Sequence, residues 1–196
     1  MNKLGRILLS LLAGALLLEV GTATAQDYTY DVGYFANANA SGAPAAQLRL
    51  TNDGYDEAEN MCANIYVFDT AEEMQECCSC EITPDGYLDL SVNTNLLGNI
   101  LDHGTKPTRG IIKVVSTVLH DGVCSPTYAG AVPGIKGWLT HVEKGATSGA
   151  FSLTETPLTD SYLSTEELGV NLTYTCGFVE SLGTSTGVCS CADAGD

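Results

Sequence analysis

The sequence predicts an all-β protein: an antiparallel β-sandwich, immunoglobulin-like or jelly-roll-like with undetermined strand order, stapled by disulfides and carrying one or two short helical turns. Three observations lead to this prediction. Short apolar or alternating segments recur along the chain, Gly, Pro and Asn turn signals separate them, and eight cysteines follow a predicted export signal. A content of 44% apolar residues and 21 glycines is typical of a globular, loop-rich chain.

The first segments alternate or are rich in strand formers. Apolar and polar residues alternate over 28–34 and 47–50, which is the period of a half-buried strand, and residues 63–68 favour a third strand. The small residues 36–46 bridge the first two strands. The acidic segment 69–76 predicts one helical turn.

The clearest local unit follows. Residues 78–82 and 87–92 flank the sequence Thr-Pro-Asp-Gly at 83–86, in which the positions of proline and glycine suit a type I turn. Leu88, Leu90 and Val92 alternate with polar residues. We therefore expect a hairpin with one solvated face.

The second half adds further strands. Residues 110–118 are β-branched enough for a central strand, and 134–142, which contains the only tryptophan, 150–154 and 171–179 also favour strands. This gives eight to ten strands in total. Helical structure is expected at 95–101 and at 164–168, where Ser164 and Glu167 form a capping-box pattern.

Residues 1–25 read as a secretory signal peptide. Lys3 and Arg6 precede an apolar run over 7–18, and Ala23-Thr24-Ala25 supplies the small residues of a cleavage site before Gln26. The run has 12 residues, whereas a spanning helix needs about 20. We expect residues 26–196 to form a single disulfide-stapled domain, secreted to the periplasm or the medium, with no membrane span after cleavage.

The cysteines all lie in the predicted mature chain, and an even number in an exported protein favours disulfides. Along a strand, Cys78 and Cys80 share one face and Cys77 takes the other. The short separations predict that Cys62 pairs within this group and that Cys176 pairs with Cys189 or Cys191. The predicted disulfide set is Cys62, Cys77, Cys78, Cys80, Cys124, Cys176, Cys189 and Cys191.

Two other uses of these cysteines stay open. The sequences Cys77-Cys78-Ser79-Cys80 and Cys189-Ser190-Cys191 place thiolates close together, as in a metal site, although paired zinc ligands usually have two to four residues between them. A thiol–disulfide redox pair at Cys77 and Cys80 is the second possibility, although the flanking residues favour a strand over the helix N-terminus that lowers a thiol pKa.

The charge excludes one class of partner. Lys and Arg total 8 against 24 Asp and Glu, a net charge of −16. Nucleic-acid affinity comes from clustered basic side chains that release counterions, so we expect no nucleic-acid partner. Anionic membrane surfaces are disfavoured for the same reason.

The search for catalytic groups yields little. We predict no serine hydrolase triad. His103 and His120 lie in turn-like settings, and we interpret the histidines, His141 included, as exposed residues without a catalytic role. Their wide separations do not place two imidazoles on one metal ion. We expect no organic cofactor. A carboxylate pair for glycoside hydrolysis remains open, because such partners usually come from distant strands.

Calcium is the one ion that the sequence offers. Asp53, Asp56, Glu57 and Glu59 crowd one loop, and dense hard oxygen ligands hold Ca²⁺ in extracellular modules. The spacing does not match an EF-hand. A solvated acidic loop is the favoured alternative.

These observations lead to a functional hypothesis. We expect an exported, non-catalytic structural or binding module at or outside the cell surface, a fibre or matrix subunit in its sharpest form, with self-association or an extracellular protein or glycan as partner. The segment of Tyr28, Tyr30, Val32 and Tyr34 could pair with the open sheet edge of a neighbour, or simply form the first strand of its own sheet. The rival hypotheses are an extracellular hydrolase acting on polysaccharide or another polymer, and a thiol–disulfide protein.

Overall fold

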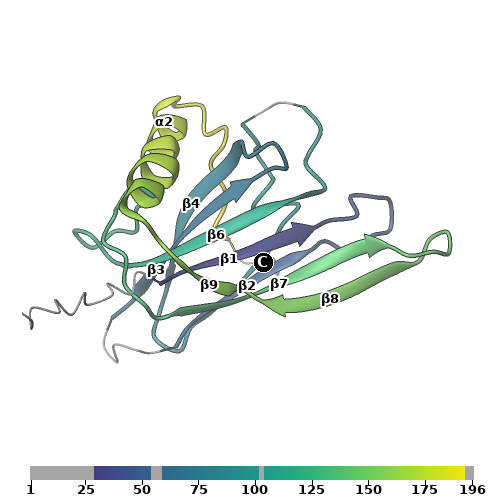
Figure 1. Ribbon diagram of the computed structural model, residues 1–196, viewed down its shortest axis with the longest axis horizontal. Coiled ribbons are helices and arrows are strands. Elements are labelled where there is room, and N and C mark those ends of the chain that lie inside the picture. Colours follow the sequence, from purple (N-terminus) through teal and green to yellow (C-terminus); the bar gives the residue numbers. More distant parts are fainter. Residues whose placement is uncertain (1–28, 54–58, 102–103, 193–196) are drawn as a thin grey trace, which may run out of the picture.

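The computed structural model describes residues 29–53, 59–101 and 104–192, in which nine strands form two antiparallel sheets packed as a sandwich (Figure 1). The prediction of an all-β sandwich is confirmed. The five-stranded sheet has the order β4-β3-β6-β1-β9 and the four-stranded sheet the order β5-β2-β7-β8. The strands are β1 (Thr29–Ala36), β2 (Gln47–Asn52), β3 (Met61–Phe68), β4 (Met74–Ile82), β5 (Tyr87–Ser91), β6 (Arg109–Val118), β7 (Ile135–Lys144), β8 (Phe151–Pro157) and β9 (Thr159–Tyr162).

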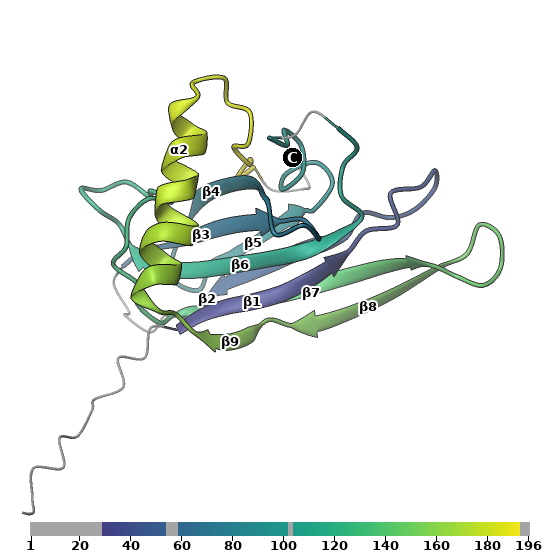
Figure 2. The same ribbon diagram turned by 45° about the horizontal axis from the view of Figure 1, so that its top comes forward.

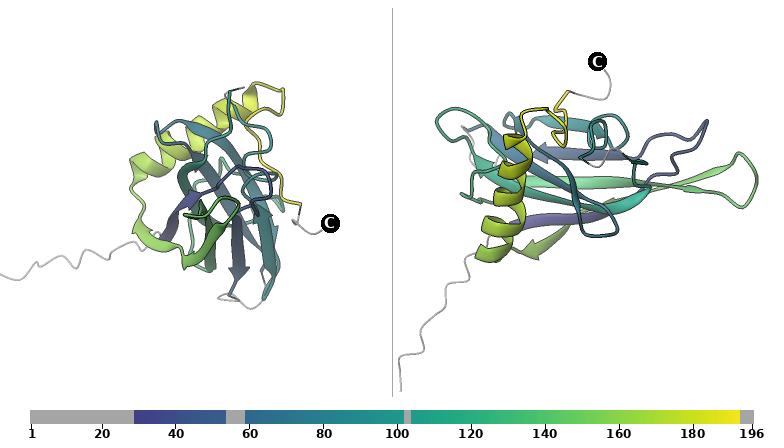
Figure 3. Two further views of the ribbon diagram at one scale, coloured as in Figure 1. Left: turned by 90° about the vertical axis from the view of Figure 1, so that its right-hand side faces the viewer. Right: turned by 90° about the horizontal axis from the view of Figure 1, so that it is seen from above.

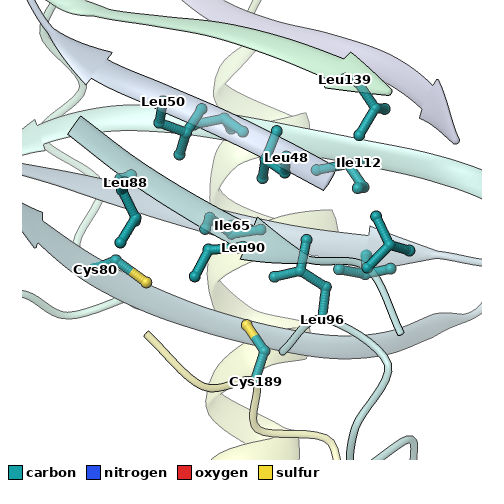
Figure 4. Packing of buried hydrophobic residues seen from close by; sticks show 14 of the residues in the cluster. Leu48, Leu50, Ile65, Cys80, Leu88, Leu90, Leu96, Ile112, Leu139 and Cys189 are labelled. Carbon is teal, nitrogen blue, oxygen red and sulfur yellow. The ribbon is translucent and has the colours of Figure 1, made fainter. Parts of the chain in front are cut away.

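The main core lies between the two sheets, where inward-pointing residues of β1 to β7 meet (Figure 4). Leu48 and Leu50 of the four-stranded sheet face Ile65 and Ile112 of the five-stranded sheet, and all four are fully buried. The predicted central strand is β6, which lies between β3 and β1. Its β-branched residues suit this position because a central strand is covered along both edges.

A helical segment covers the outer face of the five-stranded sheet, across its strands (Figure 2). It consists of a π-helical part, η1 (Glu167–Tyr174), and α2 (Thr175–Ser181). The Ser164 hydroxyl accepts a hydrogen bond from the Glu167 N–H at 3.0 Å, which confirms the predicted helix start. The helix lies on one side of the two sheets, and the β7–β8 hairpin extends beyond the other strands (Figure 3).

The prediction of a strand over 171–179 is wrong, because these residues belong to the helix. The segment contains strand formers such as Val, Thr, Tyr and Phe, which misled the prediction. Its buried side chains instead recur at helical spacing, and this periodicity outweighs residue preference. The buried side chains are Leu168, Leu172, Cys176 and Val179.

Two other predicted helical turns are also absent from the described residues. At 69–76 the Asp69 carboxylate accepts hydrogen bonds from the N–H groups of Ala71 and Glu73, at 2.8 and 3.0 Å, and this local turn leads directly into β4. Residues 95–101 form consecutive turns instead of a helix.

The predicted hairpin over 78–92 is wrong in its pairing. A turn does join the two strands, with a 2.7 Å hydrogen bond from the Gly86 N–H to the Thr83 carbonyl, but β4 and β5 belong to different sheets. Asp85 has a φ of 57°, which fits type II geometry instead of the expected type I. The predicted alternation in β5 holds, because Leu88 and Leu90 are buried.

The chain also changes sheet between β8 and β9. Leu158 lies at the crossing, and its N–H donates to the Gly137 carbonyl at 2.8 Å. A Cβ atom at Gly33 of β1 would lie 2.5 Å from the Leu158 side chain, and one at Gly137 of β7 would lie 2.6 Å away. The two glycines therefore make room for a leucine that closes this side of the sandwich.

All eight cysteines form disulfides, as predicted, but two predicted pairings are wrong. Cys62 bonds Cys124, because its side chain faces the outer surface of β3, where the Tyr66 hydroxyl also donates to the Pro126 carbonyl at 2.6 Å. Cys176 bonds Cys77, because the helix packs on the face of β4 that Cys77 occupies. Cys78 and Cys80 share the opposite face, as predicted, and bond Cys189 and Cys191.

These last two disulfides bring the C-terminal tail onto the edge strand β4. The Cys77 N–H donates to the Gly187 carbonyl at 2.8 Å, the Cys189 N–H donates to the Cys77 carbonyl at 3.1 Å, and Val188 pairs with Cys77 in a parallel bridge. The tail thus occupies hydrogen-bonding positions that an open edge would leave for another chain.

Candidate binding surface

The helix carries apolar side chains on two faces, and only one of these faces is buried. The second row recurs every four residues, so its members lie along one side of the helix. An exposed apolar row of this kind is a candidate interaction surface. The row, called the helix stripe below, consists of Val170, Tyr174, Phe178 and Leu182, which are 55%, 73%, 57% and 43% exposed.

A shallow groove of about 520 Å³ lies beside the helix stripe. Small residues recur along it, again every four positions, and Thr127 from the loop after β6 completes its wall. A Cβ atom at Gly169 would meet open space, so a partner can approach the helix backbone closely here. The lining residues, all of them uncharged, are Thr127, Gly169, Thr173, Tyr174, Gly177, Phe178 and Ser181.

A second groove, of about 460 Å³, separates the helix from the bare part of the five-stranded sheet. Its floor contains Phe68 of β3 and Ile111 of β6, which are paired across the two strands. Tyr34 of β1 pairs with Ile111 on the other side and extends the apolar row beyond the groove. Ile111 and Tyr34 are 39% and 59% exposed.

Charged and polar groups form the wall of this second groove. Lys113 donates to Glu167 of the helix, and its ammonium group lies 4.9 Å from the centre of the Phe68 ring. Asn171 donates to the other Glu167 oxygen at 2.7 Å. Burial raises the pKa of Glu167, but the hydrogen bond from Asn171 and the charge of Lys113 outweigh it and hold this pKa below its usual value. The carboxylate therefore stays ionised.

A buried carboxyl group meets an exposed one on the side of the sandwich where β8 leads into β9. Asp31 of β1 and Asp160 of β9 face each other across the strand pair and share a hydrogen bond. Burial, and then the hydrogen bond and charge of Asp160, raise the pKa of Asp31 to about 7, while Lys136 acts in the opposite direction. At neutral pH the Asp31 carboxyl group is therefore protonated for part of the time.

A third carboxyl group with a raised pKa lies near the disulfides. Glu76 of β4 is fully buried, and one of its oxygens accepts a 2.6 Å hydrogen bond from the Asn99 N–H. Its other oxygen has no hydrogen-bond partner among the described residues. Burial raises the pKa of Glu76 to about 7, although the Asn99 hydrogen bond and the charge of Lys106 oppose the shift.

The histidines lie apart from one another where the structure describes them. His120 is exposed in a turn, and its Nδ1 atom lies 3.6 Å from the Asp121 carboxylate. His141 lies in β7, within the predicted strand, but it is buried instead of exposed; its Nε2 atom contacts the Thr156 hydroxyl at 2.7 Å and its ring stacks on Tyr34. Burial lowers the pKa of His141. His103 lies outside the described residues.

One sequence pattern was overlooked in predicting no serine triad. Residues 183–187 read Gly-Thr-Ser-Thr-Gly, which matches the G-x-S-x-G spelling of a nucleophile elbow. An elbow requires a serine between a strand and the following helix, whereas Ser185 follows α2 and precedes the tail. The positive φ of 57° at Ser185 therefore belongs to a surface turn.

The predicted calcium loop is described only in part. Asp56 and Glu57 lie outside the described residues, so the site stays a prediction. The Asp53 N–H donates to the Gly134 carbonyl at 3.0 Å, and the Glu59 carbonyl accepts a hydrogen bond from Asn52 at 3.4 Å.

The predicted strand-exchange segment forms β1, which lies between β6 and β9 of its own sheet. Tyr30 is buried under the helix and Val32 packs against the same cluster, while Tyr34 is exposed. Tyr28 lies outside the described residues. Exchange between chains stays a prediction.

The sequence reasoning missed both grooves and the helix stripe. The signal that could have found the stripe is the second apolar row at helical spacing, which the assignment of 171–179 to a strand concealed. The contact between Asp31 and Asp160 had no such signal, because the two residues are far apart in the chain.

Comparison with known proteins adds no family. No protein-family model and no curated protein matches the chain. Among solved structures, the chain is similar to a Thermotoga maritima protein described as Thermotoga maritima 1070, with 15% sequence identity, coverage of 67% of this chain and 90% of that chain, and a TM-score of 0.42. A likeness of this size carries no argument about function.

Proposed function

We propose that the protein is an exported, non-catalytic β-sandwich that acts as a structural or binding module at or outside the cell surface, with a subunit of a fibre or matrix as its sharpest form. The helix stripe is the observation that carries this proposal. Four large apolar side chains on one helix face remain in water, and burying them against a partner would recover the hydrophobic free energy that the isolated chain forgoes.

Charge favours this face for contact between copies. The chain has a net charge of −16, so most approaches of two copies bring carboxylates together. The groove beside the helix stripe is lined by uncharged residues, so a second copy can pack there with little repulsion. Self-association through the helix stripe is therefore the most specific form of the proposal.

Export is supported by two features. The predicted signal peptide would direct the chain out of the cytoplasm, and four disulfides are typical of an oxidising compartment. None of the helices among the described residues has the length and apolar character needed to cross a membrane.

Sedimentation velocity of the oxidised protein over a range of concentrations tests the proposal. We expect reversible association that the double variant Tyr174→Ser/Phe178→Ser abolishes. Tyr87→Ser is the matched control, because Tyr87 is 56% exposed on the other sheet and should leave association unchanged. Monomers at every concentration, or equal behaviour of the two variants, would count against self-association through this face.

Strand exchange requires a separate measurement. If β1 were donated to a neighbour, removing residues 26–46 would leave the acceptor sheet open and abolish assembly. Assembly that survives this deletion would exclude exchange, because the donor strand would be missing from every copy.

The hydrolase alternative has one observation in its favour, the meeting of Asp31 and Asp160. Glycosidase carboxyl groups lie about 5–5.5 Å apart in retaining enzymes and about 6.5–9.5 Å apart in inverting enzymes, to leave room for the sugar or a water molecule. Asp31 and Asp160 instead share a direct hydrogen bond. Turnover of a polysaccharide by the native protein that Asp160→Asn abolishes would favour the hydrolase over the binding module.

A further inference from the structure

We propose that Cys78, Cys80, Cys189 and Cys191, once reduced, form a single tetrathiolate site for a zinc-class divalent cation. The two neighbouring disulfides are then the oxidised state of a metal site that redox chemistry switches. The proposal is independent of the binding function and rests on the way in which β4 and the tail present their sulfur atoms.

Three of the four sulfur atoms are already gathered in one place, and the fourth, that of Cys189, is bonded to one of these three, Cys78. Cys78 and Cys80 lie on one face of β4, and the tail runs parallel to β4 and places Cys189 and Cys191 opposite them. The Sγ atoms of Cys78 and Cys80 are 4.0 Å apart, and with that of Cys191 they all lie within 4.8 Å of one another. The Cys80 and Cys189 sulfurs point toward each other from facing segments (Figure 4).

These distances fit a tetrahedral metal site. With Zn–S bonds of about 2.3 Å, the sulfur atoms of a tetrahedral ZnS₄ site lie about 3.8 Å apart. The Sγ atoms of Cys78 and Cys80 are within a few tenths of an ångström of this spacing. Reduction lets each bonded pair separate toward the same value, and rotation of the freed Cys189 side chain toward the other three sulfur atoms would complete the site.

The backbone holds both arms in place without these two disulfides. Apart from its pairing with Cys77, the tail is fixed by the Ser190 N–H, which donates to the Asn95 carbonyl at 3.0 Å, and by the Asn95 side chain, which donates to the Ala192 carbonyl at 2.6 Å. The disulfide between Cys77 and Cys176, whose residues are both fully buried, anchors β4 to the helix. β4 and the tail should therefore stay aligned when the disulfides Cys78–Cys189 and Cys80–Cys191 open.

Accessibility favours reduction that starts at Cys191 and reaches the buried Cys78–Cys189 bond by exchange. Cys124 is also partly exposed, so the variant Cys62→Ser/Cys124→Ser below removes the one competing accessible disulfide. Cys191 is exposed, so the bond between Cys80 and Cys191 should open first. The resulting Cys80 thiolate lies beside Cys78, and the neighbouring disulfide then becomes accessible to reductant or to exchange. Cys77 and Cys176 should react last because water does not reach them.

The chemistry balances with a water-soluble phosphine as reductant. Each disulfide takes two electrons from one phosphine, which leaves as its oxide with the oxygen of a water molecule, and two thiols form. The four thiols from two disulfides then bind one Zn²⁺ and release four protons. The soft thiolate ligands select Zn²⁺ or Co²⁺ over Ca²⁺ and Mg²⁺.

Titration of Co²⁺ into the phosphine-treated protein tests the proposal. Mass spectrometry after thiol alkylation should first show four alkylated cysteines and two remaining disulfides. We expect one Co²⁺ per chain with the intense visible bands of a tetrahedral tetrathiolate complex, and displacement of these bands by Zn²⁺. The circular dichroism spectrum should keep its β-sheet signal.

Two double variants make the result specific. Cys80→Ser/Cys191→Ser leaves two of the four thiols and should lose the tetrahedral spectrum, whereas Cys62→Ser/Cys124→Ser removes the distant disulfide and should keep it. The proposal would be overturned by the absence of stoichiometric binding or by equal spectra from the two variants. It would also be overturned if Cys77 and Cys176 were alkylated before the four cysteines of the proposed site.

Discussion

The two sides on which the sandwich closes are built by different means. On one side the chain turns from β4 into β5, and three disulfides tie β4 to the helix and to the tail. On the other side β8 leads into β9, and the closure depends on the packing of Leu158 and on the hydrogen bond between Asp31 and Asp160. The first side, called the covalent side below, is reinforced by disulfides to the helix and the tail, whereas the other depends on packing and on a proton.

This difference teaches where the molecule can respond to its surroundings. Each side contains a buried carboxyl group with a pKa of about 7, Glu76 on the covalent side and Asp31 on the other. Loss of the proton from Glu76 occurs in a strand that disulfides hold. Loss of the proton from Asp31 places two carboxylates together at a four-residue edge strand, so β9 is the element that pH can loosen.

Among the changes proposed for these two sides, removal of the disulfide between Cys77 and Cys176 should have the largest effect on stability. The bond between Cys78 and Cys189 already attaches Cys189 next to Cys77. The bond between Cys77 and Cys176 therefore closes a loop that contains the 13-residue separation between Cys176 and Cys189. Its removal in Cys77→Ala/Cys176→Ala should lower the free energy of unfolding by about 3 kcal/mol. Urea unfolding followed by circular dichroism measures it.

The matched control is Cys80→Ser/Cys191→Ser. The bond between Cys78 and Cys189, two residues away on each strand, still closes nearly the same loop, so we expect a loss of only about 1–2 kcal/mol. An equal or greater loss in the control would show that the outer disulfide is the main covalent closure.

On the non-covalent side, Leu158→Ala should destabilise the fold by about 2 kcal/mol, because it leaves a cavity between Gly33 and Gly137 in a partly buried position. The reverse change, Gly137→Ala, should also destabilise, because its Cβ would clash with Leu158. In the double variant the two losses should be less than additive. Strict additivity would mean that Leu158 does not fill this space.

The pH dependence should separate the two sides further. A carboxyl group whose pKa is raised from 3.8 to about 7 contributes stability that is complete below pH 4 and is lost as pH rises through 7. Asp31→Asn keeps a hydrogen-bond donor toward Asp160 without the charge, so at pH 8 it should stabilise the fold by about 1–2 kcal/mol, with little effect at pH 4.

Glu76→Gln is the companion to this variant on the covalent side. Amide hydrogen exchange in β9 should accelerate between pH 5 and pH 8, beyond the intrinsic pH effect, in the native protein and in Glu76→Gln but not in Asp31→Asn. Equal behaviour of the two variants would show that the carboxyl pair does not control β9.

The smallest effect is expected where the helix begins, between the two sides. Ser164→Ala removes the hydroxyl that accepts the Glu167 N–H and should cost about 1 kcal/mol. Thr165→Ala, at the next and exposed position, should change thermal unfolding far less. Equal shifts in the melting temperature would argue against a capping role for Ser164.

The covalent side was the more predictable from the sequence. Eight cysteines and the two-residue period of a strand sufficed to place Cys77 opposite Cys78 and Cys80 and to predict disulfides, but partners distant in the chain, such as Cys62 and Cys124, left no local signal. A local turn at 83–86 likewise could not reveal that β4 and β5 join different sheets, since β4 pairs with the preceding strand β3 while β5 pairs with the more distant β2.

The sequence offered little indication of the contacts on the β8–β9 side or of the candidate binding surface. Leu158, Gly33 and Gly137 meet only after three strands have assembled, and Asp31 meets Asp160 by strand register. The helix was mistaken because strand-forming residues were given more weight than the periodicity of Leu168, Leu172 and Cys176. Residue preference is a weak guide where a sheet already offers an apolar face to cover.

Mass-spectrometric mapping of the disulfides in the native, unreduced protein tests the central claim most directly. With fragmentation that cleaves the chain between Cys77 and Cys78, between Cys78 and Cys80 and between Cys189 and Cys191, we predict the pairs Cys62–Cys124, Cys77–Cys176, Cys78–Cys189 and Cys80–Cys191 and no alkylatable thiol. Free thiols, or a bond from Cys176 to the tail, would contradict a sandwich that disulfides reinforce on the β4 side.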